Sequence, residues 1–493
     1  MDIDDKSGLQ SYDISYESEF YNDQISVKEL ITNFLWGPSH ILLDYSDILL
    51  VVLCLRFTHL IIDFSRVQAE LLKNLTTIVL GLIQLKIYAE KVGLEKPEHE
   101  FSPIINLVVY YTILVIVARF LSVKTSSIVG QTKRILMGVL IVAPLLANEY
   151  LIFFHKLSRL TTIRSVLAGL IMRSSSIIMT AKYPLVDTIA CVAYLFHPAT
   201  CILGVWQPMI VIEKRRTARA DSMYGQFMNF MQQVFIATKP FLKTIALLVV
   251  YANISDLITF VDSSIDHSLL RMSLTMYLTA LEFRTSHYFS GYMSTSLLNL
   301  WENPASFPKF IVCEPIKIEF PRSLSEVVRF WNLPMHQWLK LHIFWPSRKH
   351  FPNIYVPLGL TYIVSSMLHG FKFHIWAVLL TLGFLTWLEH QLRALLSSRY
   401  SACLLSSSCE YNSQSICSRG HRRTPRNSVL VNIINSCFIL LAMTHLAYLG
   451  CIFVGNSDQA SYHDALAIWS EVYFFTHVVS VATYLAIKLI QMS

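Results

Sequence analysis

Apolar segments long enough to cross a membrane follow one another along the whole chain, and they constrain the fold more than any other feature. A transmembrane helix needs about 20 mostly apolar residues. Of the 493 residues, 54% are hydrophobic and only 15% are charged, whereas soluble domains carry about 25% charged residues. This balance excludes an ordinary cytosolic enzyme, and a disordered chain is excluded because it would be poor in bulky apolar residues. The apolar windows lie at 48–62, 71–88, 104–121, 135–154, 163–179, 185–212, 235–260, 269–300, 354–368, 373–392, 429–454 and 465–490.

The windows predict an all-α polytopic membrane protein, built as a bundle of roughly ten to twelve transmembrane or re-entrant helices. The windows 48–62 and 354–368 are short for a span, so each is tilted, re-entrant or extended by polar residues. No repeat of fixed period is visible, which argues against a solenoid and gives no support to a transporter made of inverted repeats.

Charge divides the chain into regions. The formal net charge is +7, but residues 1–40 begin with an acidic stretch, and we predict that they form a solvated tail and an interfacial segment. Residues 41–493 are predicted to form a single membrane-embedded domain with basic loops at 213–221 and 397–428. Arginine clusters beside spans orient such loops toward the cytoplasm, although binding of an anionic lipid headgroup is an alternative. Because the clusters are short and flanked by spans, no nucleic-acid partner is expected.

The nine cysteines are scattered along the chain and suggest no disulfide framework. Cys403, Cys409 and Cys417 fall within the basic loop 397–428, but their spacing is not that of a zinc knuckle. We therefore predict no metal site from the sequence.

The segment 321–344 reads PRSLSEVVRFWNLPMHQWLKLHIF and combines aromatic, basic and proline residues. Trp331 and Trp338 suit a membrane interface, where indole rings settle. Arg322, Arg329 and Lys340 could bind phosphate groups, or they could simply anchor the segment at the membrane surface.

Farther along, the sequence GLTYIVSSMLHGF places His369 at the end of an apolar helix, directly before Gly370, a plausible break or C-terminal cap. A histidine in such a sequence faces a cavity or the protein interior. The plain alternative is a packed histidine that is hydrogen-bonded to a neighbouring helix. His369 and His374 are five residues apart and lie on different sides of a helix, so they do not form a zinc pair.

These two segments together resemble the membrane-bound O-acyltransferase family. The first, WNLP followed by WL (331–339), carries the polar residue that marks this family, and the second, SMLHG (366–370), carries its histidine. The flanks FRTSHYF (283–289), FLTWLEHQLR (384–393) and THLAYLG (444–450) are most similar to the branch of the family that lipidates secreted Wnt proteins. The signature core therefore spans 283–393 within an acyltransferase domain.

The resemblance implies a helix bundle around an acyl-CoA tunnel, in a multi-pass protein of the endoplasmic reticulum membrane. It implies transfer of palmitoleate from palmitoleoyl-CoA to a serine of a Wnt protein, a step needed for Wnt secretion and signalling. The implied partners are the lipid bilayer, the Wnt substrate and the acyl-CoA co-substrate. No cofactor and no metal are expected.

The resemblance also assigns roles. A serine hydroxyl is a poor nucleophile until its proton is accepted, and His369 is the implied general base. Asn332 would orient that imidazole or donate a hydrogen bond to the thioester carbonyl as negative charge builds, whereas on the residues alone it reads as a helix cap. Ser366, on the same helical side as His369, is either a nucleophile or a hydroxyl bonded back to its own helix. The residues predicted to contact substrate or acyl-CoA are Arg322, Arg329, Trp331, Trp338, Lys340 and Ser366.

Other functions remain open at this point. Another member of the same family could acylate a lysophospholipid or a different secreted peptide, because such enzymes share the Asn/His pair. A multi-span transporter could use intramembrane polar residues such as Arg173, Glu149 and Glu389 to line a path, but repeated halves are absent.

Overall fold

The computed structural model describes residues 45–65, 69–94, 103–121, 128–179, 188–208, 223–300, 310–410, 417–453 and 462–492. Within these ranges the chain forms helices and no β-strand, apart from one isolated bridge between Ala402 and Arg423. The predicted all-α fold is confirmed. The predicted acidic tail at 1–40 and the basic loop at 213–221 lie outside the described residues.

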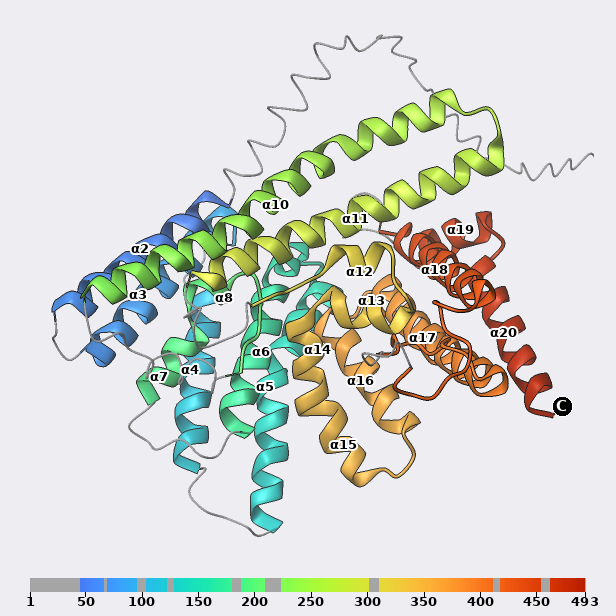
Figure 1. Cartoon of the computed structure of the whole chain (residues 1–493). Helices are drawn as coiled ribbons and strands as arrows, with labels where there is room; N and C mark the ends of the chain where they lie inside the picture. The colour runs from blue at the N-terminus through green and yellow to red at the C-terminus, as the bar shows by residue number, and fades with distance from the viewer. Residues whose placement is uncertain are drawn as a thin grey trace, which may run out of the picture.

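A first group of helices packs around one apolar core on the left of Figure 1. Its members are α2 (Ser46–Ser65), α3 (Ala69–Lys91), α4 (Pro103–Leu121), α5 (Ile128–His155), η1 (Ser158–Ile163), α6 (Arg164–Met179), α7 (Thr188–Leu195) and α8 (Pro198–Cys201).

Two long helices, α10 (Met223–Ser264) and α11 (Ser268–Asn299), form an antiparallel pair that runs across the other helices in Figure 1. Helix α11 packs against α8 at one end and against α18 (Val429–Gly450) elsewhere. It therefore joins the first group of helices to the C-terminal part of the chain.

The C-terminal part carries the predicted signature core and lies on the right of Figure 1. Its other helices are α12 (Pro315–Glu319), α13 (Leu324–Trp331), α14 (Leu333–Leu339), the π-helix η3 (Lys340–Phe344), α15 (Trp345–His350), α16 (Tyr355–Leu368), α17 (Phe373–Tyr400), α19 (Tyr462–Glu471) and α20 (Phe475–Met492).

Within the described ranges, 6 helices are long and apolar enough to cross a membrane, and the chain is a multi-pass membrane protein. The predicted count of ten to twelve spans is not confirmed. The six candidate spans are Glu70–Lys91, Leu136–His155, Phe227–Ser264, Phe373–Tyr400, Val429–Gly450 and Phe475–Met492.

One predicted window, 185–212, is wrong as a single helix. Helix α7 ends at Leu195, and Pro198 begins the short helix α8. Proline lacks the N–H that a continuous helix would need, so it is placed where that donor is unpaired anyway. The His197 side chain accepts a hydrogen bond from the Ala199 backbone N–H and caps the new helix.

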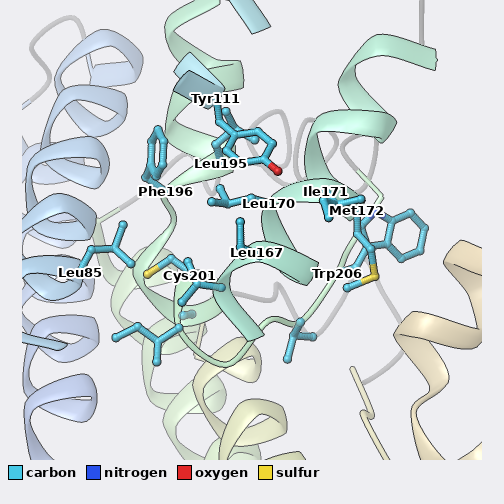
Figure 2. Packing of buried hydrophobic residues seen from close by; sticks show 14 of the residues in the cluster. Leu85, Tyr111, Leu167, Leu170, Ile171, Met172, Leu195, Phe196, Cys201 and Trp206 are labelled. Atoms are coloured by element: carbon cyan, nitrogen blue, oxygen red, sulfur yellow. The ribbon is translucent and has the colours of Figure 1, made fainter. Parts of the chain in front are cut away.

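Close packing holds the first group of helices together, as Figure 2 shows for part of this core. Lipid tails are as apolar as leucine, so helices in a membrane associate through tight contacts and small residues. Gly81 on α3 illustrates this, because a Cβ atom there would collide with the Phe196 carbonyl. Leu167 from α6 and Tyr111 from α4 are fully buried in the same core.

Candidate active site

His369 directly follows α16, at the point where the helix ends. Its backbone N–H donates to the Ser366 carbonyl at 3.1 Å, and the Gly370 N–H donates to the Met367 carbonyl at 3.0 Å. Gly370 has φ +98°, a conformation that side chains disfavour and glycine adopts freely. The predicted break at Gly370 is confirmed, and it turns the chain immediately after the histidine.

An ion pair from α5 and α6 holds this turn. Arg164 binds Glu149 through two hydrogen bonds, of 2.6 and 2.9 Å, and both side chains are largely buried. The Glu149 Oε2 atom also accepts the Phe371 backbone N–H at 3.1 Å. On the other side of the turn, the Trp376 indole donates to the Gly370 carbonyl at 2.8 Å. We call Glu149, Arg164 and Trp376 the His369 clamp.

The His369 side chain is exposed, although Ser366, Leu368 and Gly370 beside it are buried. His287 lies near enough to the imidazole to interact with it electrostatically. In the described part of the chain, no hydrogen-bond partner of the His369 ring is found. This placement does not match a packed histidine bonded to a neighbouring helix, and it leaves the ring accessible to a substrate.

His287 comes from α11 and links His369 to the segment that carries Asn332. Its ring stacks on the Trp331 indole, with centroids 4.3 Å apart and planes 6° from parallel. Its Nε2 atom lies 2.7 Å from the Trp331 carbonyl. Because a carbonyl only accepts, Nε2 carries the hydrogen, and Nδ1 keeps a free lone pair when the ring is neutral.

Asn332 lies at the junction of α13 and α14. Its Oδ1 atom accepts the Met335 backbone N–H at 3.0 Å and caps α14. Asn332 is therefore a helix cap, as the residues alone predicted. The Nδ2 group has no hydrogen-bond partner within the described ranges, and the side chain is half-buried. Asn332 thus presents an unused amide donor while its oxygen is occupied.

Buried ion pairs fix the segment around Asn332. Arg284 on α11 binds Glu319 at the end of α12 through two hydrogen bonds, of 2.8 and 3.0 Å, and the Tyr288 hydroxyl donates to the same carboxylate at 2.7 Å. Glu389 on α17 accepts the Leu324 backbone N–H at 2.6 Å, at the first residue of α13. Each bond satisfies a polar group that would otherwise be costly to bury.

Three predicted contact residues are already engaged with other parts of the protein. The Arg322 guanidinium donates to the Cys403 and Leu405 carbonyls, at 2.9 and 3.0 Å. The Ser366 hydroxyl donates to the Tyr362 carbonyl at 2.9 Å and is buried, which matches bonding back to its own helix rather than a nucleophile. Trp338 is wrong as an interfacial ring, because it is 3% exposed and its indole donates to Ser175 of α6 at 2.9 Å.

Arg329 and Lys340 remain available to a ligand. Both side chains are exposed, and neither has an ion-pair partner among the described residues. Burial, followed by the positive charges of Lys340 and Arg329, lowers the pKa of His336 on α14. The two cations therefore both lie near enough to His336, on the helix that Asn332 caps, to act on it electrostatically.

The implied acyl-CoA tunnel stays a prediction. An apolar pocket lies among α13, α17, α18 and α20, with Leu385, Phe438 and Val479 in its lining, but neither His369 nor Asn332 borders it.

Three cysteines whose spacing suggested no zinc knuckle in the sequence lie close together in the structure. Cys403, Cys409 and Cys417 lie together with His421, and their ligand atoms are all within 4.8 Å of one another. A seven-residue gap between the last two cysteines does not fit a knuckle, but the loop folds back and brings the side chains together.

Two residues important to the site geometry escaped the sequence interpretation. His287 lies within FRTSHYF, which contributed to the family resemblance but predicted no role for this histidine. Glu149 was predicted only to be a charged residue within the membrane. No local pattern marks either one, because each meets its partner across a large separation in sequence, 222 residues in the case of Glu149 and Phe371.

Comparisons with known proteins show which family this chain resembles. Residues 181–405 match the model of MBOAT, the membrane-bound O-acyltransferase family. The chain is 38% identical to an Anopheles gambiae protein named protein-serine O-palmitoleoyltransferase porcupine, over 42% of this chain and 44% of the relative. Proteins of the same name from Drosophila melanogaster and Homo sapiens are 30% and 34% identical, over 60% and 44% of this chain and 57% and 48% of those relatives. The chain thus spans about half the length of these curated relatives, and the predicted resemblance is confirmed.

Proposed function

Residues 181–405 match the model of the membrane-bound O-acyltransferase family, and from this match we propose that the protein transfers palmitoleate from palmitoleoyl-CoA to a serine of a secreted Wnt protein. We propose further that it acts in the endoplasmic reticulum membrane and that Wnt secretion and signalling depend on it. The names of the relatives support the acyl group and the serine acceptor. No further cofactor enters the proposal.

His369 acts as the general base in this proposal. Its neutral imidazole accepts the proton of the acceptor serine while the serine oxygen attacks the thioester carbonyl. The carbonyl oxygen becomes negatively charged in the tetrahedral intermediate. When the intermediate collapses, the carbon–sulfur bond breaks, the serine ester forms, and the CoA thiolate takes the proton back from the imidazolium. Accessibility of His369 within a rigid turn supports this role.

Asn332 supplies the electrostatic part of catalysis. Its Nδ2 group is unused, whereas its Oδ1 is held by the Met335 N–H, so the amide is fixed with its donor outward. A fixed donor stabilises an oxyanion more than water does, because it needs no reorientation during reaction. His287 is a positioning residue, since it stacks on Trp331 next to Asn332 and lies beside His369.

Arg329 and Lys340 would bind the phosphates of acyl-CoA. They are exposed, both act electrostatically on His336 of α14, and neither has an ion-pair partner within the described ranges. Arg322 is not part of this proposal, because its guanidinium is committed to loop carbonyls.

The observation that carries the proposal is the combination of an accessible His369 with the clamp that fixes its turn. The test uses microsomes containing the full chain, labelled palmitoleoyl-CoA and a Wnt peptide with its acceptor serine. We expect His369→Ala to abolish serine acylation and His155→Ala, at an exposed helix end, to leave it intact. Undiminished acylation by the His369→Ala variant would end the assignment.

The same assay separates the other candidate functions. A lysophospholipid supplied in parallel tests acylation of lipids, and acylation of that lipid but not of the peptide would replace the proposed substrate. Uptake of solute into liposomes without acyl transfer would favour a transporter.

A further inference from the structure

The loop that joins α17 to α18 gathers four side chains that bind transition metals. Cys403, Cys409, Cys417 and His421 place their Sγ and ring nitrogen atoms within 4.8 Å of one another. The three cysteines are buried and none forms a disulfide. Three thiols and one imidazole therefore converge on one point of the loop, and thiolate sulfur and imidazole nitrogen are ligands that zinc binds in proteins.

Three distances between ligand atoms in this cluster match those of a tetrahedral zinc site. Zinc–sulfur bonds are about 2.3 Å long, so two sulfurs in a tetrahedron lie about 3.8 Å apart, and a sulfur and a nitrogen slightly less. Cys403 Sγ lies 3.6 Å from Cys417 Sγ. His421 Nδ1 lies 3.4 Å from Cys409 Sγ and 3.6 Å from Cys417 Sγ. A disulfide would need sulfurs about 2.05 Å apart, so the cluster has the geometry of ligands rather than of a bridge.

The orientation of His421 gives independent support. Its Nδ1 faces the sulfurs, while its Nε2 lies 3.2 Å from the Ser397 hydroxyl on α17. That hydroxyl donates its own hydrogen to the Ala402 carbonyl at 2.6 Å, so it accepts from His421 Nε2. Histidines that bind metals characteristically donate their other N–H to such an acceptor, which fixes the ring and leaves a lone pair for the metal.

We propose that Cys403, Cys409, Cys417 and His421 bind one structural Zn²⁺ ion through three thiolates and Nδ1. Four protein ligands fill the tetrahedron and leave no open position, which is the arrangement of structural and not of catalytic zinc. The site is distinct from His369 and takes no part in acyl transfer. Soft thiolate ligands also favour zinc over magnesium or calcium.

The zinc site would fix the start of the signature segment. Arg322 donates to the Cys403 carbonyl at 2.9 Å, and Arg393 donates to the neighbouring Leu404 carbonyl at 2.9 Å. Arg393 also pairs with Glu389, the residue that caps α13 through the Leu324 N–H. The loop backbone around the metal is therefore a docking point for the N-terminus of α13, the helix that ends at Asn332.

The experiment measures metal and not activity. The full chain is purified in detergent with a reducing agent and without chelator, and its metals are quantified by mass spectrometry. We expect about one zinc per chain in the wild type and at least a tenfold lower content in Cys417→Ser. Cys437→Ser, an exposed cysteine on α18, is the matched control and should keep full zinc.

Milder variants keep the proposal testable if Cys417→Ser does not fold. His421→Cys should retain zinc, because four thiolates also form a stable tetrahedral site. Ser397→Ala should weaken zinc binding by about 10–100-fold in competition with a chromophoric chelator. A membrane-permeant zinc chelator should lower the melting temperature of the wild type, and added Zn²⁺, but not Mg²⁺, should restore it.

Three results would overturn the proposal. The first is a folded wild type that holds no zinc and takes up none when reduced and supplied with it. The second is full zinc content in Cys417→Ser. The third is a Cys403–Cys417 disulfide, found by peptide mapping without reduction, in protein isolated from cells.

Discussion

In the proposed mechanism Asn332 has two separable tasks, and substitutions can divide them. Its Oδ1 caps α14 through the Met335 N–H, and its Nδ2 is the unused donor. Asn332→Asp keeps an oxygen for the cap and removes the donor. Asn332→Ser also keeps a capping oxygen, without adding charge, and replaces the Nδ2 amide donor by a shorter hydroxyl, while Asn332→Ala removes both groups.

The two tasks predict different magnitudes. Loss of an N-cap costs about 1 kcal/mol of stability, which shifts the melting temperature of a protein this large by roughly 2 °C or less. Loss of one preorganised oxyanion donor lowers kcat by about 10²–10³-fold. We therefore expect Asn332→Asp and Asn332→Ser to lose most activity at near-normal stability, and Asn332→Ala to add only a small loss of stability.

The assay combines initial rates of serine acylation with melting temperatures, both in detergent. KM for palmitoleoyl-CoA should change little, because the donor acts on charge that develops only in the transition state. Wild-type kcat in Asn332→Asp or Asn332→Ser would refute the donor role. Loss of activity in Asn332→Ala alone, together with a lower melting temperature, would show that Asn332 matters only as a cap.

Three further predictions concern the surroundings of the site. Gly370→Ala should reduce kcat at least tenfold, because φ +98° is strained for alanine and the new Cβ would lie 2.7 Å from Arg164 Nε; a wild-type rate would contradict the need for this turn. Glu149→Gln should destabilise the chain by about 3 kcal/mol, because it leaves a largely buried Arg164 without its charge partner; thermal denaturation measures this, with the exposed Glu90→Gln on α3 as control. Arg329→Gln combined with Lys340→Gln should raise KM for acyl-CoA several-fold, with less effect at high salt, and an unchanged KM in steady-state kinetics would exclude them as phosphate ligands.

The sequence predicted local features of the site well. Gly370 marks the end of α16 because glycine adopts the positive φ of this turn without strain. Such a break can be predicted from a few neighbouring residues. Asn332 before Leu333 and Pro334 is a local helix start, so its position at the junction could be predicted, although its catalytic role remains a proposal.

Features made by distant contacts could not be predicted from the sequence. Trp338 has the aromatic character of an interfacial residue, but the hydroxyl of Ser175 offers it a buried partner. The cysteines of the α17–α18 loop are spaced irregularly, and only the fold of the loop brings Cys417 and His421 to Cys403. The break in the apolar window 185–212 could not be predicted either, because hydropathy does not register a helix end such as that before Pro198.

The His369 clamp has a consequence for how the protein matures. Glu149 and Arg164 are synthesised first, and Phe371 and Trp376, which complete the turn, emerge only after a further 200 or so residues. Chains fold from the N-terminus during synthesis. Helices α5 and α6 are therefore made before the turn at Gly370 and Phe371 that docks against them. The turn that carries His369 is therefore completed late in synthesis, when Phe371 reaches Glu149.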